Sequence, residues 1–526
     1  MRLFSPILLL LLSINLAHAQ GPHWVFFMDD QKGPVSEISP EAELRIEKRG
    51  HASLPGTRDV APDYLAGLRE AGFIIRQSSR FLNAASVEVT RPADLNRLHQ
   101  LPFVKSIQVV ARSRPRTLEQ PKPDDYLPRQ NSLSYGPSLT QNELLHIPHM
   151  HDRGYDASGI IIGVFDTGFN TEHASFDRLD VLDQYDFVDS EANAAGGYGH
   201  GDNVLSVIGG YAPGHLIGPA YGATYLLART EDESSETRAE EDNWVAAMEW
   251  ADARGVDVIS SALNYRDFDG SNDDYPYPAM DGETAIITRA ANIAAERGIL
   301  VVNSVANEGP SSGSLWPPAD SPHVLAVGSV YSNGSISGFS SRGPTYDGRI
   351  KPDVVAMGNS VYVADKSSGY THANGTSFSA PQVAGLAALL LQAYPSLSPD
   401  SIIGIFQQYG DLATHPDNSY GYGIPDLTPF FQSDAPPTIR KATIFPNPSS
   451  GRSISMMLED LGSVDRAVCQ IFDLLGRELA TLRIKPESSN IIRIHIPPTL
   501  ILESQILIIW VQFGDQVYTG KFVYVK

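Results

Sequence analysis

The sequence predicts an α/β fold with a mostly parallel sheet for the central part of this 526-residue chain. Two observations predict this fold. Continuous apolar strand patterns alternate with helix patterns there, an order that is typical of a parallel sheet covered by helices on both faces. The regions before and after it carry different patterns and indicate separate units. The expected central strands are 159–165, 223–228, 256–260, 299–302 and 324–327, and the clearest helices are 243–253 and 284–296.

The two flanking regions predict smaller units. Before residue 110, two helix patterns and two strand patterns indicate an α+β unit. After a break at 433–437, the last ~90 residues show strand patterns separated by turns, which favours a small β-sandwich. The expected N-terminal helices are 63–72 and one around Leu95 and Leu98, the N-terminal strands are 85–89 and 103–110, and the C-terminal strands are 468–472, 491–496, 506–511 and 517–525.

The first residues have the features of a signal peptide. Arg2 precedes an apolar run at 7–12, and Ala17-His18-Ala19 fits the small-x-small cleavage rule. This run is too short to span a bilayer, and no later segment reaches ~18 apolar residues, so we expect an exported protein without a transmembrane segment. The expected division is a signal peptide at 1–19, an α+β unit at 20–112, a proline-containing linker at 113–137, the α/β domain at 138–431, a linker at 432–440 and the β-sandwich at 441–526.

Charge and cysteine content exclude several functions. The net charge is −22 and there is no long basic run, so nucleic acid is not an expected partner. Cys469 is the only cysteine, which excludes an intramolecular disulfide and a zinc–thiolate site. Because Cys469 lies in an apolar run, we expect a buried structural thiol rather than a reactive one.

Three polar residues stand at positions suited to catalysis. Asp166 ends a buried strand, His200 follows a glycine just before a short apolar helix, and Ser377 opens a helix that is apolar nearly all round. Each has a plainer interpretation when taken alone. The aspartate can belong to a strand-end turn, the histidine to a helix-capping loop in which Asp202 is the N-cap, and the serine can itself be an N-cap.

Together, these segments resemble the motifs of the subtilisin-like serine protease family. The matches are Asp-Thr-Gly at 166–168, His-Gly at 200–201 and Gly-Thr-Ser-x-Ser-Ala-Pro at 375–381. The order Asp, His, Ser also fits, whereas an α/β-hydrolase would place its serine first, within G-x-S-x-G. The resemblance covers about residues 138–430. It implies a subtilisin-like three-layer fold, an acyl-enzyme mechanism on polypeptide substrates, and no required cofactor.

The resemblance also implies a role for each candidate. Ser377 would be the nucleophile, His200 the general base, and Asp166 the group that orients and stabilises the imidazolium. Asn307, in a segment that resembles the family's oxyanion hole, would donate to the oxyanion; a simple strand-to-loop turn is the alternative. The family usually has threonine where this chain has Asp202, and a negative charge there would raise the pKa of His200.

Two further departures concern substrate binding. The segment 261–265 resembles the family's substrate edge, so Ala262, Leu263 and Asn264 are expected beside the substrate. Ala306 replaces the usual glycine before the oxyanion asparagine. We expect these residues to line the P1 pocket. We also expect them to alter and narrow the range of P1 side chains that the pocket accepts.

The flanking units resemble known accessory domains. The N-terminal unit resembles the family's inhibitory propeptide, which implies a zymogen that cleaves itself between about Ser113 and Asn142. Segments 444–451 and 472–477, with a terminal Lys526, resemble the C-terminal sorting domain of type IX secretion, although the usual Gly-x-Tyr strand motif is missing. This implies export by the type IX machinery to the cell surface or the medium. An ordinary β-sandwich module is the alternative.

Two alternatives remain open from the sequence. The acidic segment 267–274 can hold a structural Ca²⁺, but its glycine does not fit an EF-hand loop, and a solvated loop explains it as well. The chain can also be an inactive, subtilisin-shaped binding protein. The four catalytic identities argue against this, while Asp202, Asn264 and Ala306 favour it.

Overall fold

The computed structural model describes most of the chain. The signal peptide expected at 1–19, most of the expected linker and residues 268–273 of the acidic segment lie outside the described residues. The described residues are 21–29, 31–50, 56–109, 112–113, 133–197, 199–232, 236–237, 239–267, 274–365, 368–431, 438–441, 443–445, 453–457, 467–472, 478–484, 491–496, 505–513 and 516–524.

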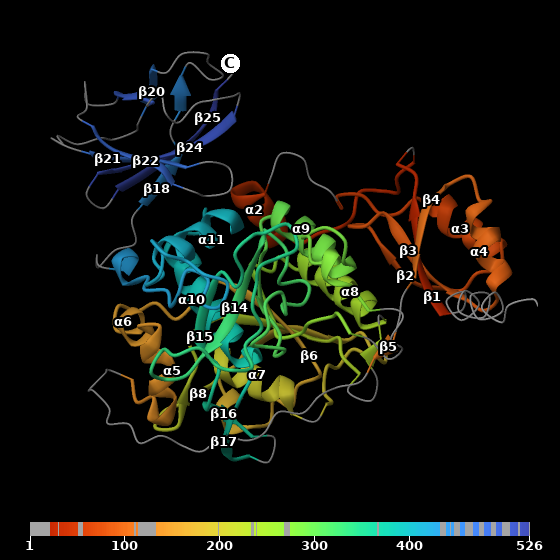
Figure 1. Ribbon diagram of the computed structural model, residues 1–526, viewed down its shortest axis with the longest axis horizontal. Coiled ribbons are helices and arrows are strands. Elements are labelled where there is room, and N and C mark those ends of the chain that lie inside the picture. The colour runs from red at the N-terminus through yellow and green to blue at the C-terminus, as the bar shows by residue number, and fades with distance from the viewer. Residues whose placement is uncertain are drawn as a thin grey trace, which may run out of the picture.

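A seven-stranded parallel sheet forms the centre of the protein (Figure 1). Its strands are β6 (Ile161–Asp166), β7 (Asp180–Asp186), β10 (Thr224–Arg229), β12 (Val258–Ser261), β13 (Leu300–Ser304), β14 (Val324–Val330) and β15 (Val354–Met357). Their order is β15-β14-β13-β12-β6-β10-β7, and every neighbouring pair is parallel. In the register, Ser260 of β12 lies opposite Val164 of β6 and Val302 of β13.

Helices cover both faces of this sheet. The α/β domain contains α5 (Leu139–Leu144), α6 (Ile147–His151), α7 (His200–Gly209), α8 (Ala239–Ala253), α9 (Ile286–Glu296), α10 (Thr376–Ala393) and α11 (Pro399–Gln408). Side chains of α7, α10 and α11 share one hydrophobic core with the sheet, and those of α8 and α9 share another. Alternate residues of the strands belong to the two cores, so the fold has three layers, as predicted. The short elements are η1 (Gly136–Ser138), η2 (Ala174–Phe176), η3 (Tyr277–Ala279), η4 (Thr428–Phe431), β8 (Tyr211–Ala212), β9 (Leu216–Ile217), β11 (Glu236–Thr237), β16 (Val361–Ala364) and β17 (Tyr370–Ala373).

The chain direction determines which groups share an edge of the sheet. α8 ends at Ala253 shortly before β12 begins, and α9 ends at Glu296 shortly before β13 begins. The C-terminal ends of both helices therefore lie at the amino edge of the sheet. Their N-terminal ends lie at the carboxyl edge, where Asp166 ends β6 and where α/β proteins gather their functional groups.

The N-terminal unit is an antiparallel sheet with helices. It contains β1 (Gly21–Phe27), α2 (Pro40–Arg49), α3 (Pro62–Glu70), β2 (Ile75–Ser79), β3 (Ala84–Val89), α4 (Pro92–His99), β4 (Val104–Val109) and β5 (Arg112–Ser113), with sheet order β2-β3-β1-β4. The expected helices and strands are present. Helix α2 was not predicted, although it has start signals: Ser39 accepts a hydrogen bond from the Ala42 N–H, and Pro40 is its first residue.

The C-terminal region forms two sheets around one core, which confirms the predicted β-sandwich. Its strands are β18 (Thr438–Lys441), β19 (Thr443–Phe445), β20 (Ser453–Met457), β21 (Ala467–Phe472), β22 (Glu478–Ile484), β23 (Ile491–His495), β24 (Gln505–Phe513) and β25 (Gln516–Tyr524), in sheets β18-β25-β24-β21-β22 and β19-β20-β23. Cys469 is fully buried in the shared core. Burial raises the pKa of its thiol to about 12, so it is structural, as expected.

His323 links the start of β14 to α11 and gives the fold a pH-dependent contact. Its Nδ1 lies 2.8 Å from Oδ1 of Asp400 in the first turn of α11. This hydrogen bond raises the pKa of His323 above its ordinary value of 6.5. Because the folded state has the higher pKa, the stabilisation is complete below pH 6.5 and is lost as the pH rises through the folded-state pKa.

We therefore expect His323→Gln to lower the free energy of unfolding by about 1.5 kcal/mol at pH 5 and by clearly less at pH 9. Urea unfolding at the two pH values measures the difference, in a Ser377→Ala background that prevents self-digestion. His415→Gln is the control, because the ring of this exposed histidine bonds the hydroxyl of the neighbouring Thr414 and, among the described residues, no carboxylate. An equal loss of unfolding free energy at both pH values would contradict a role of the His323–Asp400 ion pair in stability.

Candidate active site

An aspartate and a histidine meet at the carboxyl edge of the sheet. Asp166 is the last residue of β6 and is fully buried, and His200 is the first residue of α7. His200 Nδ1 lies 2.7 Å from Asp166 Oδ1. Since an ionised carboxylate only accepts hydrogen bonds, Nδ1 carries the proton and donates it. In the neutral ring, Nε2 is then the nitrogen that can accept a proton.

Glycines allow these two segments to approach each other. Gly199, just before His200, has a φ of 103°, in the left-handed region that favours glycine. A Cβ on Gly201 would lie 2.2 Å from the carbonyl oxygen of Gly168. The two glycine-containing motifs therefore pack backbone against backbone, which brings the imidazole to the carboxylate.

Ser377 lies at the head of the buried helix α10. It is the second residue of the helix and is 8% exposed. Its Oγ donates to the carbonyl oxygen of Ala262, 3.3 Å away and directly after β12. The ring of the next residue, Phe378, lies 5.6 Å from the His200 ring, centroid to centroid. The serine thus lies at the same edge as the histidine, and its bond to Ala262 must break before Oγ donates to a base.

Asn307 is fixed beside the serine by the residue before it. Its Oδ1 accepts hydrogen bonds from the Thr376 backbone N–H at 2.9 Å and from the Thr376 hydroxyl at 3.1 Å. These bonds orient the amide and leave Nδ2 as its donor, for which the described residues provide no hydrogen-bond partner. At the head of α10 the Thr376 N–H is taken by Asn307 and the Phe378 N–H donates to the Gly375 carbonyl oxygen, whereas the Ser377 N–H has no acceptor among the described residues. Neutral donors therefore gather where an oxyanion would form.

The residues expected beside the substrate follow β12 and β13. Ala262 and Leu263 are buried. Asn264 uses its amide on Ser304, donating to its carbonyl oxygen at 2.7 Å and accepting from its hydroxyl at 2.8 Å. The side chain of Asn264 therefore ties the ends of the two strands together. Ala306 is buried and has a φ of 79°, a conformation in which a side chain is strained and glycine is not.

Asp202 makes a structural contact with the segment that follows β6. It is buried in the first turn of α7, and its Oδ1 accepts from the backbone N–H of Asn170. The N-cap of the helix is Gly199 rather than Asp202, because the helix already begins at His200. The Asp202 carboxylate thus fastens the segment after β6 to α7.

The N-terminal unit reaches the same edge with its last described strand. β5 pairs antiparallel with β11, so that Ser113 lies opposite Glu236 and Arg112 opposite Thr237. β11 directly precedes α8, whose N-terminus lies at the carboxyl edge. Such an added strand is a common way to bind a peptide. β11 was not predicted, because two residues among charged neighbours carry no strand pattern.

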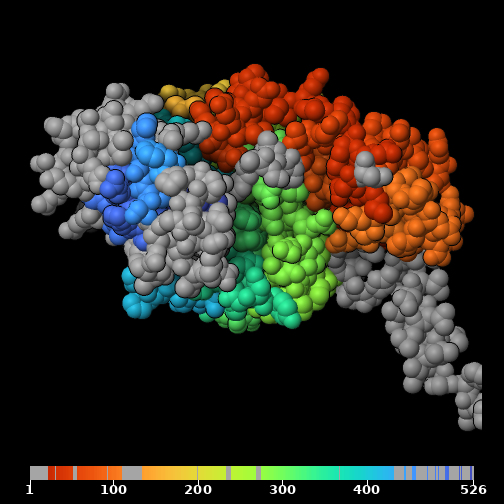
Figure 2. All heavy atoms as spheres, turned by 90° about the horizontal axis from the view of Figure 1, so that it is seen from above, coloured from red at the N-terminus to blue at the C-terminus, as the bar shows by residue number. Residues whose placement is uncertain are grey.

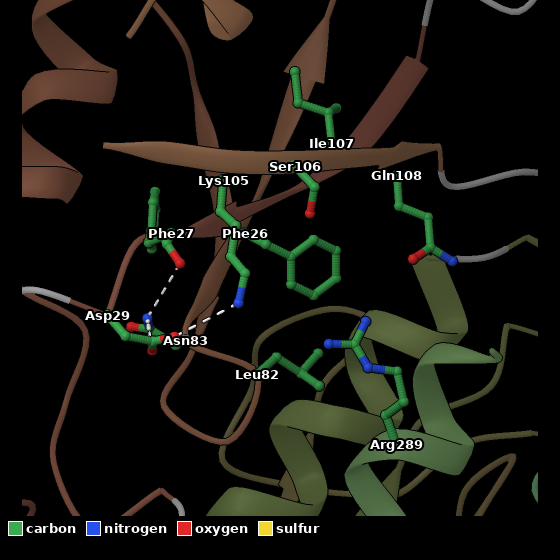
Figure 3. Close-up of a pocket in the computed structure, with 10 residues that line it drawn as sticks. All are labelled: Phe26, Phe27, Asp29, Leu82, Asn83, Lys105, Ser106, Ile107, Gln108 and Arg289. Carbon is green, nitrogen blue, oxygen red and sulfur yellow. Dashed lines mark hydrogen bonds and ion pairs between the residues drawn. The ribbon is translucent and has the colours of Figure 1, made fainter. Parts of the chain in front are cut away.

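The sheet of the N-terminal unit packs on α8 and α9. Figure 3 shows Arg289 of α9 pointing toward Phe26 of β1 across a crevice, and its guanidinium carbon lies 4.5 Å from the ring centre. Ser86 of β3 donates to Asp242 Oδ2 of α8 at 2.6 Å. Burial raises the pKa of Asp242 to about 6. The N-terminal unit therefore shields a carboxylate of the α/β domain from water.

Neither a metal cluster nor a membrane helix is found in the described part of the chain. Among those residues, no three carboxylate, imidazole or thiol groups come together as ligands for a metal ion. The acidic segment 267–274, expected as a possible calcium site, lies mostly outside them. No described helix combines the length and hydropathy that a bilayer crossing requires.

Comparisons with known proteins match both the α/β domain and the N-terminal unit. The model of the subtilase family, peptidase S8, matches residues 157–423, and that of the peptidase S8 propeptide domain of Bacteroidota matches residues 22–124. Subtilisin DY of Bacillus licheniformis is 32% identical over 285 residues, which cover 53% of this chain and 93% of the relative. Subtilisin E of Bacillus subtilis is 27% identical over 362 residues, which cover 68% of this chain and 82% of the relative.

A solved structure supports the fold. Fervidolysin from Fervidobacterium pennivorans, described as a keratinolytic enzyme related to subtilisin, aligns with a TM-score of 0.58 and 18% identity, over 93% of this chain and 70% of that chain. At this identity the likeness concerns the fold alone, and it confirms the predicted subtilisin-like architecture. The family model spans half of the chain and includes all four candidate catalytic positions. The chain therefore belongs to the subtilase family of serine endopeptidases, and its N-terminal unit contains the propeptide domain of that family.

Proposed function

We propose that Asp166, His200 and Ser377 form the catalytic triad of this endopeptidase, and that Asn307 donates to the oxyanion. The observation that carries the proposal is the 2.7 Å hydrogen bond between His200 Nδ1 and Asp166 Oδ1, at the edge of the sheet where α10 begins. It gives the imidazole the tautomer that a general base needs. The anchored amide of Asn307 supplies a fixed donor next to Ser377.

The proposed reaction follows from these positions. His200 Nε2 takes the hydroxyl proton as Ser377 Oγ attacks the scissile carbonyl carbon, and the Asp166 carboxylate stabilises the resulting imidazolium. Asn307 Nδ2 and the Ser377 backbone N–H bind the negative oxygen of the tetrahedral intermediate. The imidazolium then protonates the leaving amine as the C–N bond breaks. Water, deprotonated by the same histidine, hydrolyses the acyl-enzyme.

A fluorophosphonate probe tests the triad directly. The matured wild-type enzyme is expected to be labelled once, on Ser377, because the probe reacts with an activated serine. Ser379→Ala is the matched control, since this neighbouring hydroxyl is fully buried and donates to the Ala356 carbonyl oxygen. It is expected to be labelled like the wild type. Absence of labelling in the mature enzyme would favour an inactive binding protein.

The first proposed substrate is the chain itself. β5 brings the propeptide to the substrate edge and ends at Ser113, while Tyr135 and Leu139 are buried against Ile217 of the catalytic domain. We therefore propose cleavage within 114–132 and a catalytic domain that begins near residue 133 rather than 138. N-terminal sequencing of the mature enzyme determines the site. A mature N-terminus beyond Leu139 would contradict this boundary.

Ala306 is proposed to shape the P1 pocket together with Ala262 and Leu263. Because its φ of 79° strains an L-residue, Ala306→Gly is expected to raise the free energy of unfolding by about 1 kcal/mol. Removing the methyl group is also expected to increase cleavage after large P1 side chains. Urea unfolding and a peptide library measure the two effects.

The control for Ala306→Gly is Ala364→Gly, a buried alanine in β16 whose φ is not positive. This variant is expected to lose stability, since glycine weakens a strand and leaves a space. A wild-type enzyme that already prefers large aromatic P1 residues would contradict a narrowed pocket.

We also propose that the C-terminal β-sandwich is a type IX sorting domain and that the enzyme acts outside the cell. The proposal rests on the resemblance of segments 444–451 and 472–477 and on the signal peptide expected at 1–19. Deletion of 441–526 is expected to retain the protein in the periplasm of a host with type IX secretion. Unchanged export of the deletion variant would identify an ordinary accessory module.

A further inference from the structure

Helix α2 of the propeptide lies beside α9 and apart from the propeptide sheet (Figure 1). It packs on two glycines that follow the ends of α8 and α9. A Cβ on Gly255 would lie 2.5 Å from the Cβ of Glu41, and one on Gly298 would lie 2.9 Å from the Cβ of Arg49. From above, the N-terminal segment, in red, lies on the green part of the catalytic domain (Figure 2). The helix is thus closely fitted to the catalytic domain.

Arg45 of α2 enters a site made by the ends of those two helices. Its Nη1 donates to the carbonyl oxygen of Val256 at 2.8 Å and lies 3.4 Å from that of Asp252, and its Nε donates to that of Arg297 at 3.2 Å. Its Nη2 donates to the Asp252 carboxylate. The side chain is almost fully buried. The Asp252 carbonyl lies in the last turn of α8 and also accepts from the Gly255 N–H, that of Arg297 belongs to the C-cap residue of α9, and that of Val256 follows three residues after α8. Carbonyl oxygens at the C-terminal end of a helix carry negative partial charge, so a guanidinium suits them.

The catalytic domain holds this site in place by itself. Asp252 Oδ2 accepts hydrogen bonds from Nε of Arg297, which belongs to the catalytic domain, and the two groups form a buried ion pair at 2.9 Å. Asp252 Oδ1 is the oxygen that faces Arg45. The carboxylate and the helix-end carbonyls are therefore oriented by residues that remain when the propeptide leaves.

The rest of the interface has the same division of charge. In each of its further ion pairs the propeptide supplies the arginine and the catalytic domain supplies the carboxylate, whereas Arg289 and Arg297 of the catalytic domain face aromatic rings of the propeptide. The further ion pairs are Arg49–Asp257, Arg76–Asp242, Arg80–Glu249 and Arg80–Asp252. The occupant that this face selects is therefore cationic, and Arg45 is its most buried arginine.

The site is remote from the catalytic groups. Arg45 binds where α8 and α9 end, which is the amino edge of the sheet, whereas Asp166 and Ser377 lie at the carboxyl edge. Besides the packing of its sheet on α8 and α9, the propeptide therefore attaches at both edges of the central sheet. Its tail strand β5 lies at the substrate edge, and α2 binds at the opposite edge.

We propose that Asp252 and the helix-end carbonyls form an arginine-binding site, separate from the active site, through which Arg45 keeps the propeptide bound after its tail has been cut. The inference rests on the proposed self-cleavage within 114–132. Cutting there removes the covalent link but leaves the Arg45 contacts intact. Release of the propeptide, and hence the onset of activity, is then limited by dissociation at this site.

The full-length precursor tests this proposal. After self-cleavage, size-exclusion chromatography at successive times measures how long the cut propeptide co-elutes with the catalytic domain. For Arg45→Ala we expect cleavage at the wild-type rate, dissociation about 30-fold faster and a shorter lag before activity, which corresponds to about 2 kcal/mol. Arg45→Lys is expected to be intermediate, because an ammonium cannot reproduce the forked contacts. Arg69→Ala, at an exposed arginine of α3, is expected to behave as wild type.

A second measurement keeps the test valid if Arg45→Ala does not fold. Millimolar arginine amide is expected to shorten the lag of the wild-type enzyme more than the same concentration of lysine amide. Equal co-elution times for Arg45→Ala and wild type, or equal effects of the two amides, would overturn the proposal. Failure of self-cleavage would instead appear as an uncut chain. An added protease then cuts the linker, and the same dissociation times are measured.

Discussion

Ser377→Ala is expected to abolish peptide hydrolysis and to leave the protein as an uncut precursor. Without the hydroxyl, His200 has no nucleophile to activate, and only the oxyanion donors and substrate binding remain. The expected loss in kcat is about 10⁶-fold, a magnitude taken from subtilisin, the relative in which it was measured. A chromogenic peptide assay measures turnover, and a denaturing gel shows whether the propeptide is still attached.

Two controls separate chemistry from folding. Ser379→Ala changes a hydroxyl two residues away in the same helix and is expected to retain activity within about tenfold. A trace of the wild-type enzyme, added to the Ser377→Ala precursor, shows whether the linker can be cut by another molecule. Maturation of pure Ser377→Ala at the wild-type rate, with no protease added, would refute both the nucleophile and self-processing.

The centre of the fold could be predicted because its elements are defined locally. The apolar strand patterns at 159–165 and 299–302 correspond to β6 and β13 within two residues at each end. The edge strands β7 and β15 escaped prediction. β7 carries an aspartate at every third position, which fits no strand pattern, and β15 is only four residues long. An edge strand depends on its one neighbour more than on its own pattern.

In the candidate site, too, the residues in short sequence motifs could be predicted, whereas the contacts between residues far apart in the sequence could not. Asp166, His200 and Ser377 could be proposed because each lies in a short motif that resembles one of the subtilisin-like family. The hydrogen bonds of Asn307 to Thr376 join residues 69 apart, and no local pattern encodes such a contact. The amide of Asn264, which remains a proposed substrate-edge residue, bonds Ser304, 40 residues away, and no local pattern encodes this contact either.

The propeptide interface was the least predictable part. Arg45 lies between Leu44 and Ile46 in a charged segment and would be taken for a solvated side chain. It is buried only because the helix ends at Asp252 and Arg297 fold beneath it, more than 200 residues away. A buried charge of this kind follows from tertiary contacts, not from composition.

Asp166→Asn is expected to reduce kcat/KM by about 10⁴-fold without destabilising the protein. An asparagine amide presents a donor to His200 Nδ1, which favours the tautomer with its proton on Nε2, and that nitrogen can no longer act as the base. Asp166 Oδ2 is buried and has no hydrogen-bond partner among the described residues. Neutralising this carboxylate removes a desolvation cost, so the free energy of unfolding is expected to stay equal or rise by about 1 kcal/mol. Kinetics on a peptide substrate and urea unfolding measure the two quantities.

Asp186→Asn is the matched control, because it changes another buried carboxylate that ends a strand of the same sheet. Asp186 Oδ2 accepts from Arg229 Nη1 at 2.6 Å, and its Oδ1 accepts from the N–H groups of Val188 and Asp189. This variant is expected to lose about 2 kcal/mol of stability and to keep activity within about tenfold. The two variants are thus expected to differ in their change in the free energy of unfolding. This difference distinguishes a carboxylate that serves catalysis at a cost in stability from one that stabilises the fold. A large loss of stability in Asp166→Asn, with activity retained, would remove Asp166 from the triad.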